Sequence, residues 1–183
     1  WSYGETGYHS LAAAIVQERY EREAMASAFR ILGEGQLSLT KFLLLTDSSA
    51  GIDLKDFRAT LTHILERTTP ETDLFVFPNL SMDSLDYTTP TINRGSKGVW
   101  MGVGPKKREL PREFKGAPGP SVNDVRVFSP GCLVVGAPPY RGSDQEEAAV
   151  VARIAADPAF AAWPLVVLSD EPARAARSTI NFL

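Results

Sequence analysis

The chain has 183 residues, of which 44% are hydrophobic and 22% are charged, and its formal net charge is -3 at pH 7. This is the composition of a soluble globular protein that can bury a core, and the charge gives no reason to expect nucleic acid as a partner. The single cysteine excludes an intrachain disulfide and a cysteine-based zinc site, and no apolar run is as long as a membrane span. These features favour a cytoplasmic protein.

Strands and helices alternate over the first hundred residues. Three short apolar runs bounded by turn-forming residues predict buried strands, at 41–47, 73–77 and 99–103. Residues 21–32 and 54–65 have the three- and four-residue spacing of amphipathic helices, and Asp53 is the expected N-cap of the second. Residues 11–16 are apolar but rich in alanine, so both a strand and a helix fit them.

The remaining residues continue the alternation. Residues 106–120 are basic and rich in proline and glycine, which predicts a loop or flap. Further apolar strands are expected at 125–128, 132–135 and 165–168. Ser143 and Glu146 form a capping box that opens a helix, Pro158 begins a shorter one, and Asp170 is the expected cap of the last.

Apolar strands that alternate with amphipathic helices imply an α/β fold, in which a mainly parallel or mixed sheet has helices on both faces. We therefore predict a single α/β domain over residues 1–183, with 42–45, 74–77 and 165–168 as strands of one sheet. The sequence begins at Trp1 and ends in apolar residues. A fragment of a longer protein is therefore expected, without that protein's N-terminal part.

The glycine-rich segment 94–104, which contains Lys97, is the most unusual in the sequence. Glycines allow backbone N–H groups to approach an anion, and a lysine adds a positive charge, so this segment could hold a phosphate. Its spacing differs from that of a P-loop. The alternative is a turn that leads into a strand and carries a solvated lysine. Composition alone favours that alternative.

Other residues capable of chemistry favour structural roles. Asp83 and Asp86 could bind a metal or exchange protons, but aspartate is also common in turns and no third ligand lies nearby. His63 directly precedes the apolar Ile64 of its helix and is expected at the surface. Cys132 lies in an apolar strand and is expected to be a small core residue rather than a nucleophile.

Several segments recur in the order found in one known family. At 33–47 a polar turn and a Thr–Lys pair lead into an apolar strand that ends in Asp, and an Asp-rich helix start follows at 53–57. Leu-Asp-Tyr at 85–87 then precedes Gly-Ser-Lys at 95–97. Over about residues 7–104 the chain resembles the C-terminal domain of UbiD-type decarboxylases.

This resemblance implies where the chemistry lies. In the family, an N-terminal domain holds most of the prenylated FMN, a divalent metal and a Glu–Arg–Glu set for proton transfer, so no catalytic residue or metal ligand is assigned in this chain. The lysine of the family's Gly-x-Lys motif matches Lys97, which with Ser96 and Gly95 is expected to contact the cofactor phosphate. Trp100 is expected to wall the substrate pocket. The implied partners are the N-terminal domain of the same protein and further copies in a homo-oligomer.

The resemblance therefore implies a cofactor-closing and oligomerising domain of a non-oxidative decarboxylase of aromatic or unsaturated carboxylic acids. The version at 35–41 and the stretch 127–135 resemble the branch that acts on a dihydroxynaphthoate in the futalosine route to menaquinone. The chain alone is predicted to be inactive. The alternatives are a non-catalytic assembly module and an unrelated α/β domain that binds a small phosphorylated ligand.

Overall fold

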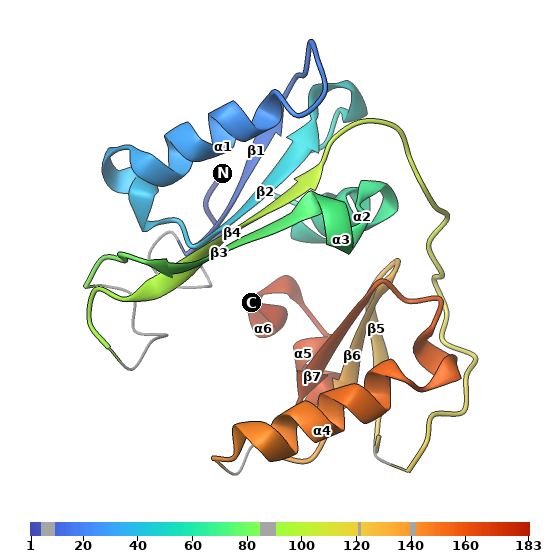
Figure 1. Ribbon diagram of the computed structural model, residues 1–183. Helices are drawn as coiled ribbons and strands as arrows, with labels where there is room; N and C mark the ends of the chain where they lie inside the picture. Colours follow the sequence, from blue (N-terminus) through green and yellow to red (C-terminus); the bar gives the residue numbers. More distant parts are fainter. Residues whose placement is uncertain (5–9, 85–90, 121, 140–141) are drawn as a thin grey trace. The chain divides into compact units, whose positions relative to one another are not determined.

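In the computed structural model the chain forms two α/β units, Trp1–Arg108 and Glu109–Leu183, each with its own sheet (Figure 1). The α/β class agrees with the sequence, whereas the single sheet does not. The structure describes residues 1–4, 10–84, 91–120, 122–139 and 142–183. Within these ranges, no helix has the length and apolarity needed to cross a bilayer.

The first unit contains a four-stranded mixed sheet in the order β1-β2-β4-β3. Its strands are β1 (Leu11–Val16), β2 (Phe42–Asp47), β3 (Leu74–Leu80) and β4 (Gly95–Gly102). The strands β1, β2 and β4 are parallel, and β3 is antiparallel to β4. The alanine-rich segment at 11–16 is thus a strand.

Two helices lie on opposite faces of this sheet (Figure 1). The first, α1 (Ala24–Gly33), packs its buried alanines and Leu32 against the odd-numbered side chains of β2 and β4. On the other face lies α2 (Phe57–Arg67), where Ile64 packs against Gly102. Asp53 does not cap α2, contrary to expectation. Its carboxylate accepts from the backbone N–H of Lys55 in a preceding turn, and Asp56 caps the helix instead.

The strand β3 differs from the buried strand that the sequence predicts. It lies at the edge of the sheet, and the side chains of Leu74 and Val76 are 39% and 57% exposed. Pro78 does not end it, because an edge strand tolerates a residue without an N–H. An apolar run shows that a strand forms, but it does not show which strands will pair with it.

The second unit contains a three-stranded sheet in the order β5-β6-β7. Its strands are β5 (Val125–Ser129), β6 (Cys132–Gly136) and β7 (Leu165–Ser169). The strand β6 is antiparallel to β5 and parallel to β7, and α4 (Asp144–Ala155) connects β6 to β7. Residues 165–168, which we expected in the sheet of 42–45, therefore belong to this second sheet.

Short helical turns complete the described chain. Three are 3₁₀ helices: η2 (Gly35–Leu39), η3 (Ser48–Ala50) and η4 (Pro158–Phe160). Three are single α-helical turns: α3 (Pro70–Asp73), α5 (Pro172–Ala175) and α6 (Thr179–Phe182). Ser143 caps α4 as predicted, whereas Glu171 rather than Asp170 occupies the N-cap position of α5. Residues 106–120 form no helix or strand, as the sequence predicts.

Candidate functional site

The predicted site residues all lie on β4. Gly95, Ser96 and Lys97 form its first three positions and Trp100 its sixth, so the expected loop at 95–98 is the beginning of a strand. The N–H of Gly98 donates to the carbonyl oxygen of Lys41 at 2.8 Å and is therefore committed to the sheet rather than to an anion.

Close packing explains the glycine at position 98. A Cβ atom there would lie 2.8 Å from the ring of Phe42, which covers Gly98 from the neighbouring strand. This glycine therefore allows a ring to pack on a central strand, a requirement that a turn signal in the sequence does not reveal.

Lys97 and Trp100 lie on opposite faces of the sheet. Side chains alternate along a strand, and Phe77, the register partner of Lys97, packs with Val99 in the core under α1. Trp100 shares the other face with Gly98 and Gly102. The side chain of Ser96 lies on the same face as that of Trp100. The strand therefore does not bring Lys97 and Trp100 into one pocket.

The amino group of Lys97 is buried beneath the connection between α1 and β2. The side chain is 7% exposed, and its Nζ donates to the carbonyl oxygens of Ser38 and of Thr40, the latter at 2.9 Å. In the described parts of the chain, no carboxylate forms an ion pair with it. Burial lowers the pKa of Lys97. The site therefore offers a desolvated amine that two neutral acceptors hold.

Trp100 borders an apolar surface that α2 leaves uncovered. Its register partners are Leu44 and Leu74, and Phe42 and Val76 lie two residues away along β2 and β3. We call Phe42, Leu74, Val76 and Trp100 the Trp100 face. The side chain of Phe42 is 45% exposed. The indole Nε1 of Trp100 is buried and lacks a hydrogen-bond partner among the residues that the structure describes.

A second group of polar residues, which the sequence did not reveal, lies at the carboxyl ends of β2 and β4. The carboxylate of Asp47 accepts from the backbone N–H and the hydroxyl of Ser49 and, at 3.1 Å, from the N–H of Gly104. The bonds from Ser49 and, to a lesser extent, from Gly104 hold the pKa of Asp47 below its usual value. An aspartate at the carboxyl end of an apolar parallel strand was the available signal.

His63 belongs to this group and is buried rather than at the surface as predicted. The side chain is 4% exposed, and its Nε2 lies 2.9 Å from the carbonyl oxygen of Gly102 and 3.3 Å from the backbone nitrogen of Asp47. Burial and the nearby Arg67 lower its pKa. The buried face of α2 includes both His63 and Ile64. The spacing of the apolar residues did not predict so wide a buried face.

The remaining candidates are Asp83, Asp86 and Cys132. Within the described ranges, no group of three or more His, Cys, Asp or Glu side chains could hold a metal. Asp83 is exposed, and Asp86 lies outside the described residues. Cys132 is fully buried, and burial raises the pKa of its thiol to about 12, as expected for a core residue.

The first unit matches a known protein family. The family model for the 3-octaprenyl-4-hydroxybenzoate carboxy-lyase C-terminal domain matches residues 1–102. The chain belongs to the UbiD family of carboxy-lyases. The matched region ends at the last residue of β4, so it contains the whole first sheet, Lys97 and Trp100. The second unit lies outside it.

Relatives of the chain are about three times longer. A 4-hydroxybenzoate decarboxylase subunit from Chlamydia pneumoniae is 43% identical over 182 residues, which are 100% of this chain and 30% of that protein. An uncharacterized protein of Chlamydia trachomatis is 44% identical over the same proportions. Vanillic acid decarboxylase of Sedimentibacter hydroxybenzoicus aligns over 75% of this chain and 25% of its own, at 19% identity and a TM-score of 0.47.

Proposed function

We propose that this chain is the cofactor-closing domain of a non-oxidative decarboxylase of aromatic or unsaturated carboxylic acids. The UbiD family membership supports the reaction class, and the match is to a domain that is C-terminal in the family. The name of the Chlamydia pneumoniae relative, which is similar over the whole chain, favours a hydroxybenzoate-type acid. A dihydroxynaphthoate is the finer proposal, and it rests on the sequence resemblance at 35–41.

The observation that carries the proposal is the uncompensated amine of Lys97. Burying an ammonium group without a countercharge is costly, and in the described residues only carbonyl oxygens accept from it. A phosphate group at this position would supply the missing negative charge and favour the charged form of Lys97. We therefore assign the phosphate of a prenylated FMN to Lys97, with Gly95 on the same face of β4, whereas the side chain of Ser96 lies on the opposite face with Trp100.

The other elements of the proposal are divided between this chain and the rest of the protein. When bound, prenylated FMN supplies an electron sink for the loss of carbon dioxide. The divalent metal and the proton-transfer residues are assigned to the N-terminal domain. The proposed holoenzyme is cytoplasmic and homo-oligomeric.

The Trp100 face supports a role in the substrate pocket. Exposed apolar side chains surround Trp100, and its buried indole N–H lacks an acceptor in the described chain. An aromatic acid packed on this face would cover the apolar surface and could accept from the indole. Because Lys97 lies on the other face, the two residues would bind different parts of the bound molecules.

A non-catalytic assembly module is the second candidate. The two carbonyl acceptors favour it, because they give the amine of Lys97 a structural role without any ligand. An unrelated α/β domain, the third possibility raised by the sequence, is inconsistent with membership of the UbiD family.

Binding of FMN and riboflavin to the complete protein separates the two candidates. If Lys97 contacts the phosphate, Lys97→Met should weaken FMN binding about tenfold to a hundredfold and leave riboflavin binding unchanged, because riboflavin has no phosphate. Lys115→Met, at an exposed lysine paired with Glu113, is the matched control and should change neither affinity. Equal loss for both flavins, or no loss for either, would favour the assembly module.

A further inference from the structure

Residues 1–3, which we call the N-terminal arm, lie along the outer edge of β1. The amino group of Trp1 donates to the carbonyl oxygen of Ala13 at 2.9 Å, and the N–H of Ala13 donates to the carbonyl oxygen of Trp1 at 2.8 Å. This exchange of two bonds is typical of an antiparallel pair. The N–H of Tyr3 donates to the carbonyl oxygen of Leu11 at 2.9 Å. The direction and the register of the arm on β1 are therefore defined.

The side chains of the arm fix it to α2 and to the turn before it. Tyr3 is 2% exposed, and its ring meets the ring of Phe57 edge-on, with the centroids 5.0 Å apart. The hydroxyl of Tyr3 donates to the carbonyl oxygen of Leu54 at 2.7 Å. The Nζ of Lys55 lies 5.4 Å from the ring centroid of Trp1. The path of the arm is therefore set by side-chain packing as well as by main-chain bonds.

The arm covers only part of the β1 edge. Main-chain groups alternate along a strand, so the N–H and C=O of Ile15 point to the same side as those of Leu11 and Ala13. In the part of the chain that the structure describes, no residue pairs with Ile15 on that side. Ile15 is also 49% exposed, although its side chain is apolar. One further pairing position is therefore open beyond Trp1.

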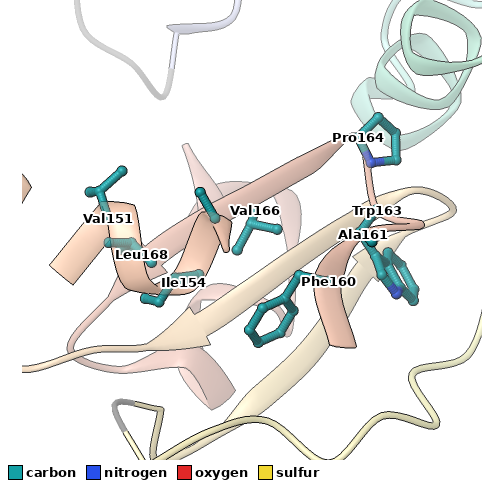
Figure 2. Close-up of a pocket in the computed structure, with 9 residues that line it drawn as sticks. Val151, Ile154, Phe160, Ala161, Trp163, Pro164, Val166 and Leu168 are labelled. Atoms are coloured by element: carbon teal, nitrogen blue, oxygen red, sulfur yellow. The ribbon is translucent and has the colours of Figure 1, made fainter. Parts of the chain in front are cut away.

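The edge of β7 gives no comparable information about what covers it. An apolar cavity of about 360 Å³ lies beside this strand, and Val166 and Leu168 line it together with residues of α4 (Figure 2). Among the described residues, none pairs with the outer side of β7. At β1, by contrast, a segment that is already in place fixes the direction and the register of its continuation.

We propose that the residues preceding Trp1 in the longer protein continue the arm as a strand antiparallel to β1. The register places the residue immediately before Trp1 opposite Ala14, and the residue two positions before Trp1 opposite Ile15. A peptide N–H at Trp1 makes the same bond to Ala13 as the amino group does. This proposal rests on the proposed function, in which the N-terminal domain of the same protein precedes this one, and it names the surface that receives the connection.

The register also defines the chemistry of the added strand. Residues directly opposite each other share a face of the sheet, so the side chain two positions before Trp1 lies beside Ile15, on the face of α2. Burial of Ile15 favours an apolar side chain at that position. The side chain immediately before Trp1 lies on the other face with Ala14, which packs in the core under α1. The N-terminal domain is then joined through a strand of the sheet rather than through a flexible linker.

Disulfide cross-linking in the complete protein tests the register. Opposite side chains are closest in a pair that exchanges no main-chain bonds, and the position before Trp1 forms such a pair with Ala14. A cysteine at that position should therefore cross-link with Ala14→Cys under mild oxidation, as detected by mass spectrometry. Ser2→Cys with Ala12→Cys is the matched positive control, because this pair is already present. Moving the first cysteine one position further from Trp1 should abolish the cross-link.

Amide hydrogen exchange in the unsubstituted complete protein is the second measurement. The N–H of Ile15 should exchange at least about a hundredfold more slowly than in an unstructured peptide, as should the N–H of Ala13, which is bonded to Trp1. Rapid exchange at Ile15 beside slow exchange at Ala13 would overturn the proposal. Failure of the Ala14→Cys cross-link where the control pair cross-links would also overturn it. Neither readout involves a flavin, so the assignment of Lys97 to the phosphate stands or falls separately.

Discussion

Gly102 of β4 and Ile64 of α2 are in such close contact that no side chain fits between the strand and the helix. A Cβ atom at position 102 would lie 2.6 Å from Cδ1 and 2.9 Å from Cα of Ile64. The second distance is to the backbone of the helix, which a rotamer change cannot relieve.

We therefore expect Gly102→Ala to destabilise the protein by about 1–3 kcal/mol, because α2 would have to move away from the sheet. Gly33→Ala is the control. Gly33 lies in α1 with no atom within 4 Å of the added carbon, and alanine is the better helix former. Urea denaturation of both variants measures the difference. Equal stabilities would show that α2 is free to shift.

The pH dependence of stability should report the burial of His63. Its pKa is lowered from 6.5 in the folded protein, so the neutral ring is favoured there. The contribution of neutral His63 to the free energy of unfolding is complete above pH 6.5. This contribution is lost as the pH falls below 6.5 and through the lower pKa of the folded protein. The slope in that window is at most about 1.4 kcal/mol per pH unit.

His63→Gln should flatten this part of the stability curve, since glutamine does not titrate. Urea denaturation above and below pH 6.5 makes the comparison, and His9→Gln, at the other histidine of the chain, is the control. A curve that is as steep in His63→Gln as in the wild type would assign the acid sensitivity to the carboxylates instead.

Cys132 should resist thiol reagents in the folded protein. Its side chain is fully buried, and a pKa of about 12 leaves almost no thiolate at neutral pH. A disulfide reagent such as Ellman's should label the chain slowly under native conditions and rapidly in guanidinium. Rapid native labelling would show that β6 opens far more often than its central position in the sheet suggests.

The 183-residue chain should not decarboxylate hydroxybenzoates when prenylated FMN is added. Its described residues contain no cluster of acids and histidines that could hold a metal, and the proton-transfer set is assigned to another domain. Release of carbon dioxide is the measurement, with a longer protein that includes the N-terminal domain as the positive control. Turnover by the short chain would contradict the division of labour that we propose.

The sequence predicts strands and helices well where local chemistry determines them. The apolar run at 42–47 and the Ser143 cap of α4 depend on neighbouring residues, and the structure contains both. Sheet membership depends on distant contacts. The run at 165–168 is as apolar as a strand of the first sheet, and nothing in its pattern indicates that it pairs with β6.

The candidate site shows the same limit. The family resemblance predicts Lys97, from its motif, and Trp100, from the segment after it, as site residues. Strand alternation could have placed them on opposite faces once 95–98 was recognised as strand. The glycines made this strand hard to recognise. In the sequence, a glycine that is needed for close packing, such as Gly98 against Phe42 or Gly102 against Ile64, cannot be distinguished from a glycine in a turn. The burial of His63 likewise depends on how α2 lies on the sheet, which spacing alone does not fix.

The two hydrogen bonds from the amino group of Lys97 connect β4 to the chain that precedes β2. One acceptor is the carbonyl oxygen of Ser38 in η2, and the other is that of Thr40. An anion that binds the amino group of Lys97 must compete with these two carbonyl oxygens. If the hydrogen bonds break, Ser38 and Thr40 lose a contact that holds them against β4. Binding of an anion to Lys97 should therefore increase the local mobility of the chain between α1 and β2. Amide hydrogen exchange at residues 37–40 should therefore become faster when an anion binds at Lys97.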